Sequence, residues 1–486
     1  MSVEFDRTQI QGNILRGYRR SLVRHLILKV EDRATARKFL GASVGGGNAE
    51  VPGITSETPW PDKKPPPFCF NIGLTYEGLR ALGTPSDSLA SFPTEFSEGM
   101  TSRALKLGDF GSSAPENWPK PFDKPADVHV IASVYADDKQ HLDRVEAQVG
   151  RAFTVLGSRD GGNLVANPNL PGDGNLPADP KPDPDKVFFG FTDNISQPRF
   201  AEIRDDPDTK KADEPIDPLG TALLGYPTRL EGLFFRVPQP DVLGLNGTFN
   251  AFRVLAQDVK GFEAYLDKAA NELVAHPDVD QLLAPGGEAL IGKGLDRVGA
   301  LREIVAAQMC GRWRNGVPYG VSPDAQWPNP DVSRTNFDYS GASRCPAGSH
   351  MRRVNPRGGT IVQRIANYTR RLIRRGMPYV LKLDPAHPDD QERGLLGNFI
   401  GASLGAQFEA IMCDWLNLGL LDPDITGAND PLIGANTPET SWFDLTLRNG
   451  GSIRLRGFPR FVTTRGGAYT FLPSLPAIKH LSEPTA

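Results

Sequence analysis

The sequence predicts an α+β fold built from two similar halves, and three observations lead to this prediction. Stretches rich in β-branched and apolar residues, typical of strands, precede segments with apolar residues at helical spacing. Their order shows no strict βαβ repeat, which favours a sheet covered by helices on one face. The same layout begins again after the middle of the 486 residues, so we expect an N-terminal half at 1–225 and a C-terminal half at 226–486.

The first half contains three predicted strands. The first lies at residues 21–30 and leads into a helix at 32–43. Residues 68–83 repeat this order, and Thr75 is expected to begin the second helix, since threonine favours the N-cap position. The third strand, at 126–137, precedes an amphipathic helix. Strand and helix therefore follow one another throughout this half.

A long loop separates this pattern from its repetition. Residues 165–187 hold six prolines and four aspartates, a composition typical of irregular structure. A short strand at 187–191 is expected to follow. In the second half, a strand at 246–258 precedes an amphipathic helix, residues 358–385 contain further strand-like sequence, and 398–417 ends in a helix with an apolar stripe.

Composition excludes several classes of protein. The net charge of −4 with scattered basic residues predicts no nucleic-acid partner and no anionic membrane surface. No uncharged apolar stretch reaches the ~18 residues that a spanning helix needs. The N-terminus lacks the basic and then apolar layout of a secretory signal, so we expect a cytoplasmic protein or one exported by a leaderless route. The four cysteines form no CxxC pair, and the oligomeric state is left open.

One histidine is the strongest candidate for chemistry. His350 lies in CPAGSHMRRVNPR between Pro346 and Pro356, which allow only a turn or two of regular structure. A histidine restrained in this way can offer one ring nitrogen in a fixed direction, although an ordinary surface or core histidine would fit the local sequence too. The seven histidines form no HxH or HxxxH pair, which argues against a zinc site of the metalloprotease kind.

Two further stretches carry candidate polar groups. GFTDNISQPRF puts Asp193 just after the predicted strand at 187–191, a common place for a catalytic carboxylate, although a turn-capping role is equally compatible. IRRGMPYV puts Arg374 and Arg375 before a glycine and a proline, where they could also form a solvated basic turn.

Together these motifs resemble those of the dye-decolorising peroxidases, a family of haem enzymes. The resemblance rests on IQGNILRGY, GFTDNISQP, GRWRNG, CPAGSHMRRVNPR, IRRGMPYV and FVTTRGGAYTFLPSLPA, which occur in order over about 460 residues. It implies two ferredoxin-like halves, with antiparallel sheets covered by helices, that enclose haem b. It also implies a peroxidase that reduces hydrogen peroxide and oxidises aromatic donors, such as dyes and phenols and with Mn(II) as a further candidate, through an oxoferryl intermediate.

The resemblance also assigns roles to individual residues. His350 would be the axial ligand of the haem iron, and Arg357 would pair with a haem propionate. On the opposite side of the haem, Asp193 would be the acid–base group and Arg374 the fixed cation. Tyr379 would carry electrons from donors at the surface, with Trp415 as a weaker candidate.

Several points stay open in the sequence. Glu409 and Asp414 are both candidates to accept a hydrogen bond from His350, while Arg352 and Arg353 could bind propionates or face solvent. The family's usual glycine after the aspartate is Asn194 here, which suits a positive φ. Gly397 and Asn398 stand where relatives often carry a bulky aromatic, which suggests a roomier or wetter pocket. These departures support an alternative function, a haem-binding or haem-handling protein with little turnover.

Overall fold

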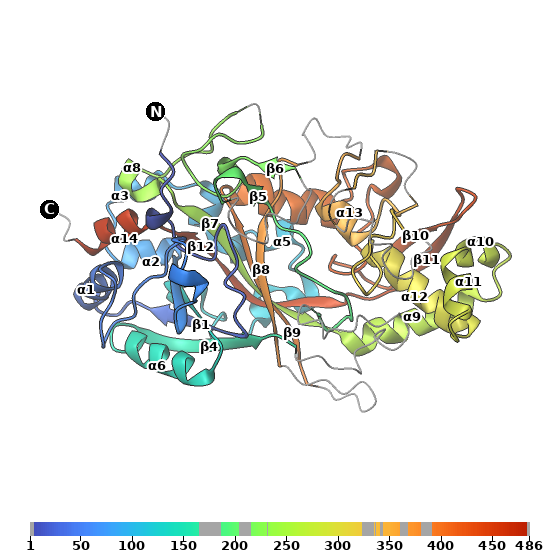
Figure 1. Ribbon diagram of the computed structural model, residues 1–486, viewed down its shortest axis with the longest axis horizontal. Helices are drawn as coiled ribbons and strands as arrows, with labels where there is room; N and C mark the ends of the chain where they lie inside the picture. The colour runs from blue at the N-terminus through green and yellow to red at the C-terminus, as the bar shows by residue number, and fades with distance from the viewer. Residues whose placement is uncertain are drawn as a thin grey trace.

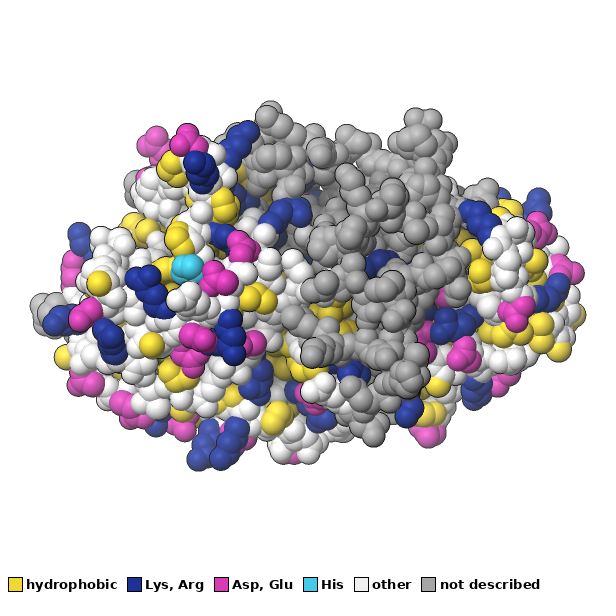
Figure 2. Space-filling view, turned by 60° about the horizontal axis from the view of Figure 1, so that its bottom comes forward, with side chains coloured by type: hydrophobic (Ala, Val, Ile, Leu, Met, Phe, Trp, Pro, Cys, Tyr) yellow, Lys and Arg dark blue, Asp and Glu magenta, His cyan; other side chains and the backbone are white. Residues whose placement is uncertain are grey.

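The computed structural model describes most of the chain. The described residues are 4–164, 186–203, 215–230, 232–322, 335, 337–340, 344–359, 368–380 and 391–483. Charged side chains of both signs are interspersed over the described surface visible in Figure 2, in keeping with the small net charge. Among the described residues, no helix combines the length and the apolar character needed to cross a membrane.

The first half contributes four antiparallel strands in the spatial order β4–β1–β3–β2. Its elements are β1 (Leu22–Lys29), α1 (Arg33–Val44), β2 (Phe68–Leu74), β3 (Val130–Ala136), α6 (Lys139–Val149) and β4 (Thr154–Gly162). Four short helices, α2 (Tyr76–Ala81), α3 (Ser86–Ala90), α4 (Thr94–Ser102) and α5 (Ala104–Leu107), lie between β2 and β3. Thr75 caps α2 as predicted, because its hydroxyl accepts a hydrogen bond from the Gly78 N–H.

The second half repeats this arrangement in the order β12–β7–β9–β8. Its sheet elements are β7 (Thr248–Gln257), α9 (Val259–Leu273), β8 (Ile373–Tyr379), β9 (Gly394–Gly401) and β12 (Val462–Leu472). In each half the spatial order of the four strands is fourth, first, third, second, which is the ferredoxin-like order. The predicted fold of two ferredoxin-like halves with antiparallel strands is therefore confirmed.

The remaining elements surround this sheet. They are β5 (Arg199–Phe200), β6 (Ile216–Asp217), α8 (Asp241–Gly244), α10 (Val279–Leu283), α11 (Gly286–Ile291), α12 (Arg297–Cys310), α13 (His350–Val354), β10 (Trp442–Thr446), β11 (Ser452–Arg456), α14 (Leu475–Ser482) and two π-helical turns at Leu404–Glu409 and Ile411–Asn417. Figure 1 shows α1, α6 and α14 at one end of an elongated molecule and α9 to α12 at the other, with β8 and β9 between them.

The two halves combine into one curved sheet of eight strands. β2 pairs with β12 in the middle of the sheet, and the two end strands, β4 and β8, come together. A Cβ added at Gly161 in β4 would lie 3.0 Å from the Pro378 carbonyl oxygen in β8, so a glycine is needed for this close approach. Because both halves form one barrel-like sheet, the division near residue 225 stays a prediction.

Two local expectations were wrong. Residues 187–191 form a turn rather than a strand, since Gly190 has φ 78° and the Val187 N–H bonds back to the Phe191 carbonyl. Its phenylalanines are buried among the side chains of α9 and α12, which explains the continuous hydrophobicity. The strand β4 was not anticipated, because TVLGSRDGG alternates weakly and ends in two glycines.

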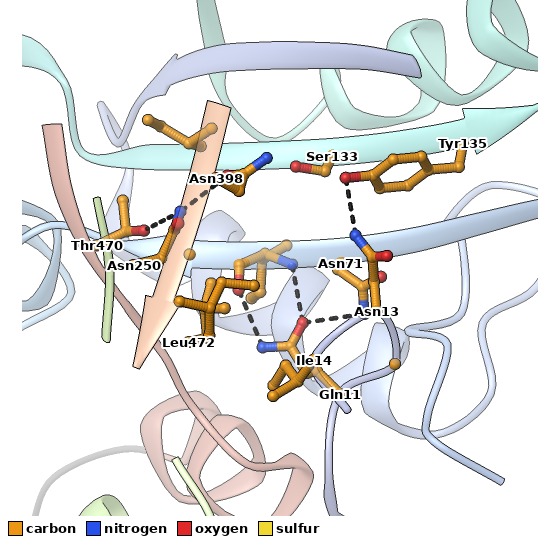
Figure 3. A pocket seen from close by; sticks show the side chains of 15 residues that line it. Gln11, Asn13, Ile14, Asn71, Ser133, Tyr135, Asn250, Asn398, Thr470 and Leu472 are labelled. Atoms are coloured by element: carbon orange, nitrogen blue, oxygen red, sulfur yellow. Dashed lines mark hydrogen bonds between the residues drawn. The ribbon is translucent and has the colours of Figure 1, made fainter. Parts of the chain in front are cut away.

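The interior of the barrel is partly polar (Figure 3). Asn250 Nδ2 donates to Asn398 Oδ1 at 2.9 Å and to Thr470 Oγ1 at 3.2 Å, and Asn13 Nδ2 donates to Tyr135 Oη at 2.8 Å. These groups surround a cavity of about 30 Å³, enough space for one water molecule. The N-terminal segment that supplies Asn13 closes this side of the barrel and lines the larger cavity described below as well.

A buried histidine in this interior predicts a pH-dependent stability. His25 on β1 is 1% exposed, its Nδ1 lies 2.8 Å from Ser133 Oγ, and burial lowers its pKa from 6.5 to about 3. Between pH 6.5 and about 3, His25 is therefore unprotonated in the folded protein but protonated in the unfolded chain. The free energy of unfolding should therefore fall with pH from about 6.5 towards 3, by up to ~1.4 kcal/mol per pH unit from this group.

The variant His25→Gln should lose that component. Urea unfolding of both proteins at several pH values between 7 and 4.5 would measure it. We expect the difference in unfolding free energy between wild type and variant to change steadily below pH 6.5 and to be constant above it. Parallel pH profiles would contradict the assignment.

Candidate active site

A large cavity lies against the second half of the sheet and measures about 1280 Å³. This exceeds the 300–1,000 Å³ typical of small-molecule pockets, so it has space for a large flat cofactor. β8 and β9 form one wall, while α13 and the π-helical turns form another. Its lining includes all four residues predicted for catalysis and cofactor binding, which are His350, Arg357, Asp193 and Arg374.

His350 is the first residue of α13, and its ring is held from behind. The preceding Ser349 anchors the helix, because its hydroxyl donates to the Gln308 carbonyl at 2.5 Å. His350 Nδ1 lies 3.0 Å from Asp430 Oδ2. The other carboxylate oxygen of Asp430 accepts from the backbone N–H groups of Leu432 and Ile433, each at 2.9 Å.

Asp430 fixes the chemical state of the histidine ring. Burial alone would raise the pKa of Asp430, but the His350 ring, the Arg353 guanidinium and the Ile433 N–H together lower it below its usual value. An ionised carboxylate accepts a hydrogen bond from the Nδ1–H group, which leaves Nε2 as the ring nitrogen that can offer a lone pair to a ligand bond. A neutral imidazole supported by a carboxylate is the usual form of a metal-ligating histidine.

The two acceptors considered from the sequence are both wrong. Glu409 instead accepts hydrogen bonds from Arg103 at 3.0 and 2.8 Å and from the Tyr469 hydroxyl at 3.0 Å. Asp414 pairs with Arg370 at 3.0 Å. Asp430 lies 80 residues beyond His350 and outside any recognisable motif, so only the tertiary structure reveals it.

Asp193 lies on a loop that is attached directly to β8. The Gln197 side chain donates to the Arg374 carbonyl at 2.9 Å and accepts from the Arg374 N–H at 3.0 Å. The Arg374 guanidinium in turn donates to the carbonyls of Ser196 and Leu372. Asn194 has φ 55°, the positive φ that the sequence predicts for it. Sequence reasoning missed Gln197, although it stands four residues after the aspartate.

The two neighbouring arginines of β8 both line the cavity but bind different partners. The Arg375 side chain donates to the carbonyls of Asn13 and Ile14 at 2.9 and 3.0 Å. Burial lowers the pKa of Arg375 to about 10. Arg374 therefore joins the loop of Asp193, while Arg375 ties β8 to the N-terminal segment.

Arg357 connects the histidine segment to the same loop. It is buried, has φ 41°, and donates to Ser196 Oγ at 3.3 Å and to the Thr335 carbonyl. Its guanidinium lies 4.6 Å from the centre of the Phe337 ring. Arg353, a second candidate for a propionate or for solvent, does neither: it is buried and donates to the carbonyls of Gly348, Trp415 and Ala428.

The space beside Gly397 is occupied by a neighbouring ring. A Cβ at residue 397 would lie 2.6 Å from the Phe399 ring, which covers the glycine and packs against Phe408 with centroids 5.4 Å apart. Asn398, the second departure, bonds to Asn250 in the barrel interior. An aromatic ring therefore does line this part of the cavity, supplied from a neighbouring position.

The two residues predicted to carry electrons differ in their surroundings. Tyr379 on β8 is mostly buried, and its hydroxyl donates to Glu392 at 3.2 Å. Burial and the Glu392 charge raise the pKa of Tyr379 well above its usual value. Trp415 is 1% exposed and belongs to the main core, with Arg370 over its ring at 4.7 Å.

The residues of this cavity fit a haem group. The His350 ring is held through Nδ1 and leaves Nε2 for a ligand bond, and Arg357 and other cations can bind carboxylates. Apolar side chains form part of the walls, beside many polar and charged ones. The apolar lining includes Leu255, Leu395, Phe399, Phe408, Ile411, Met412, Leu416 and Ile433. Among the described residues, no cluster of three or more His, Cys, Asp or Glu could hold a bare metal ion instead.

Comparison with known proteins finds relatives that match almost the whole chain. The family model of the DyP dimeric alpha+beta barrel domain matches residues 9–158. A dye-decolorizing peroxidase of Exidia glandulosa is 28% identical over 96% of this chain and 85% of its own length. A multifunctional dye peroxidase of Amycolatopsis sp. is 28% identical over 97% of this chain and 95% of its own.

Solved structures extend the likeness to the whole fold. A dye-decolorizing peroxidase in complex with 2,6-dimethoxyphenol superposes with a TM-score of 0.76 at 26% identity and covers 99% of this chain and all of that one. A fungal enzyme of Auricularia auricula-judae gives the same TM-score at 24% identity over 99% of this chain and 100% of that one. Over almost its full length, and in its barrel, the chain is therefore similar to the DyP-type peroxidases in both sequence and fold.

Proposed function

We propose that this protein is a haem b peroxidase that reduces hydrogen peroxide and oxidises bulky aromatic donors. The observation that carries the proposal is one cavity lined by a carboxylate-supported histidine and by a separate carboxylate and arginine. Dyes and phenols are the proposed donors, because the relatives include dye peroxidases and a complex with a dimethoxyphenol. Mn(II) is a further candidate donor.

On the histidine side, the chain would set the position and electron density of the ligand. Asp430 keeps the proton on His350 Nδ1 and leaves Nε2 to bind iron. Arg357 would bind a propionate, since its guanidinium matches a carboxylate. When bound, haem would supply the redox chemistry that peroxide reduction and donor oxidation require.

On the other side, the chain would move a proton. Asp193 is exposed to the cavity and would take a proton from one peroxide oxygen and deliver it to the other, which leaves as water. Arg374 would stabilise the negative charge that develops on the departing oxygen. Its attachment to the loop of Asp193 would keep the two groups in a constant relation.

Absorption spectroscopy tests the proposal directly. The Soret band of purified, haem-loaded protein should change within seconds of adding equimolar hydrogen peroxide. An anthraquinone-type dye added afterwards should then be bleached. An unchanged ferric spectrum would count against the peroxidase and in favour of a haem-handling protein.

Tyr379 is the proposed entry point for electrons from bulky donors. A dye cannot enter a cavity that already contains haem, whereas an aromatic side chain near Glu392 and the surface can pass an electron inwards. The variant Tyr379→Phe should oxidise a bulky dye several-fold more slowly while a small phenol is oxidised at the wild-type rate. Steady-state kinetics with both donors would show this, and an equal loss for both would contradict it.

Asp430→Asn should make His350 a weaker electron donor to the iron while the ligand itself stays in place. The amide lacks the charge that makes the ring electron-rich, so the Fe(III)/Fe(II) midpoint potential should rise. Loss of such a partner typically costs about 10–100-fold in metal affinity or activity. Spectroelectrochemical titration would measure the potential, with Glu409→Gln as the comparison because Glu409 binds Arg103 and Tyr469 instead of the histidine. An unchanged potential would contradict the role of Asp430.

A further inference from the structure

A buried arginine outside the cavity contacts the loop of Asp193. Arg314 follows α12 in the GRWRNG motif and is 1% exposed. Its Nε donates to Glu303 at 3.1 Å, and its guanidinium also pairs with Glu263 at 3.3 Å. Two rings, Phe191 and Phe262, lie within 5.3 and 5.9 Å of the guanidinium. A full set of partners compensates this buried charge, and two rigid helices, α9 and α12, supply the carboxylates.

Both ends of Arg314 hold the chain just before Asp193. The guanidinium donates to the Phe189 carbonyl. The backbone carbonyl of Arg314 accepts from the Thr192 N–H at 2.9 Å, from the Thr192 hydroxyl at 3.2 Å and from Lys186 Nζ at 2.9 Å. Lys186 Nζ also donates to the Gly190 carbonyl at 3.0 Å. Residues 189–192 are therefore attached to Arg314 through side chain and backbone alike.

The loop is held on its other side by a separate set of contacts. Beyond Asp193, Gln197 and Ser196 bind β8 through Arg374. Asp193 thus lies on a short span between two anchors, one on the sheet and one on the charged groups of α9 and α12. Asp193 is itself exposed, so its position depends on how firmly both anchors hold the backbone.

We propose that Arg314 is a positioning residue for the peroxide reaction, and that it acts by fixing the loop that presents Asp193. This inference rests on the proposed role of Asp193. Displacement of a reacting group by about 1 Å can cost 10²-fold in rate, so a loosened loop would slow the peroxide step without touching the histidine side.

Two variants separate this role from folding. Arg314→Lys keeps a cation beside Glu303 but cannot reach all the partners of the planar guanidinium. The double variant Arg314→Met/Glu303→Gln removes both charges, so no buried carboxylate is left uncompensated. Arg302→Met is the matched control: Arg302 pairs with the same Glu263 and Glu303 on the exposed side.

The experiment combines hydrogen–deuterium exchange and stopped-flow kinetics on the haem-loaded proteins. We expect amide exchange in residues 187–197 to accelerate from wild type to Arg314→Lys to the double variant. We expect the rate constant with hydrogen peroxide to fall in the same order, by about tenfold or more in the double variant. The ferric spectrum and the KM for a small phenol should stay unchanged, and Arg302→Met should behave as wild type.

The outcomes also separate this inference from the proposed function. Unchanged exchange in 187–197, or faster exchange with an unchanged peroxide rate constant, would overturn the positioning role. An equal effect of Arg302→Met would overturn it too, because the charged cluster rather than the loop contact would then be responsible. If wild type does not react with peroxide, the proposed function fails and the peroxide role of Arg314 falls with it, whatever the exchange data show.

Discussion

Replacing His350 by alanine should remove the Soret spectrum of the wild-type protein and nearly all of its peroxidase turnover. Among the described residues that line the cavity, His350 is the histidine, and Asp430 holds its Nδ1 at 3.0 Å so that Nε2 is left for a ligand bond. Loss of a carboxylate behind such a ligand already costs about 10–100-fold, so loss of the ligand itself should cost at least ~100-fold. Haem titration followed by absorption and turnover with a phenol would measure both effects.

A second histidine–aspartate pair supplies the control for this experiment. His141 Nδ1 lies 2.7 Å from Asp138 Oδ2 on the surface, far from the cavity lining. His141→Ala removes the same kind of pair and should leave spectrum and turnover at wild-type values. Added imidazole should restore part of the wild-type spectrum to His350→Ala, because the substitution leaves a space of the size of the lost ring. Retention of haem with an unaltered Soret band in His350→Ala would refute the ligand assignment.

Asp193→Asn should give the second largest effect, confined to the reaction with peroxide. An amide cannot take the proton, so the rate constant should fall by roughly 10²–10⁴-fold, the usual contribution of general acid–base catalysis. Arg374→Lys should lower it by a smaller factor, because a point charge replaces the planar fork that also binds Ser196. Stopped-flow absorbance at varied peroxide concentration would measure each constant.

The coupling between these two residues is testable with the double variant. Groups that act on one step are not additive, so Asp193→Asn/Arg374→Lys should be little slower than Asp193→Asn alone. Asn194→Gly is the control next to the aspartate: glycine tolerates the φ of 55°, and the peroxide rate should stay within a few-fold of wild type. A normal peroxide rate in Asp193→Asn would exclude the carboxylate as the proton carrier.

Local patterns in the sequence were enough to predict four of the eight strands of the sheet and to include β8 in a longer strand-like stretch, whereas β4, β9 and β12 were not predicted. The strands β1, β2, β3 and β7 and the helices after them follow from apolar periodicity, and the Thr75 cap follows from its side-chain chemistry. The turn at 187–191 shows the limit of this reasoning. A run of buried phenylalanines reads as a strand, but its burial comes from helices α9 and α12, more than sixty residues away.

Only those residues of the candidate site that lie in recognisable sequence motifs could be predicted. His350, Arg357, Asp193 and Arg374 stand in recognisable segments and do line one cavity, whereas their roles stay predictions. The partners that hold them could not be found in this way. Asp430, Gln197 and Arg314 act through contacts that cross 80, 177 and 125 residues of sequence, and no local spacing records such distances.

The position of β8 at the end of the sheet has a consequence for solubility. An edge strand offers unpaired N–H and C=O groups on which another chain can build an intermolecular sheet. Here the Gln197 amide covers the outward N–H and C=O of Arg374, and Pro378 supplies no N–H at all. The loop that presents Asp193 thus also shields the barrel's seam from self-association. Damage to that loop should therefore shorten shelf life and promote β-aggregates on warming, in addition to slowing any reaction with peroxide.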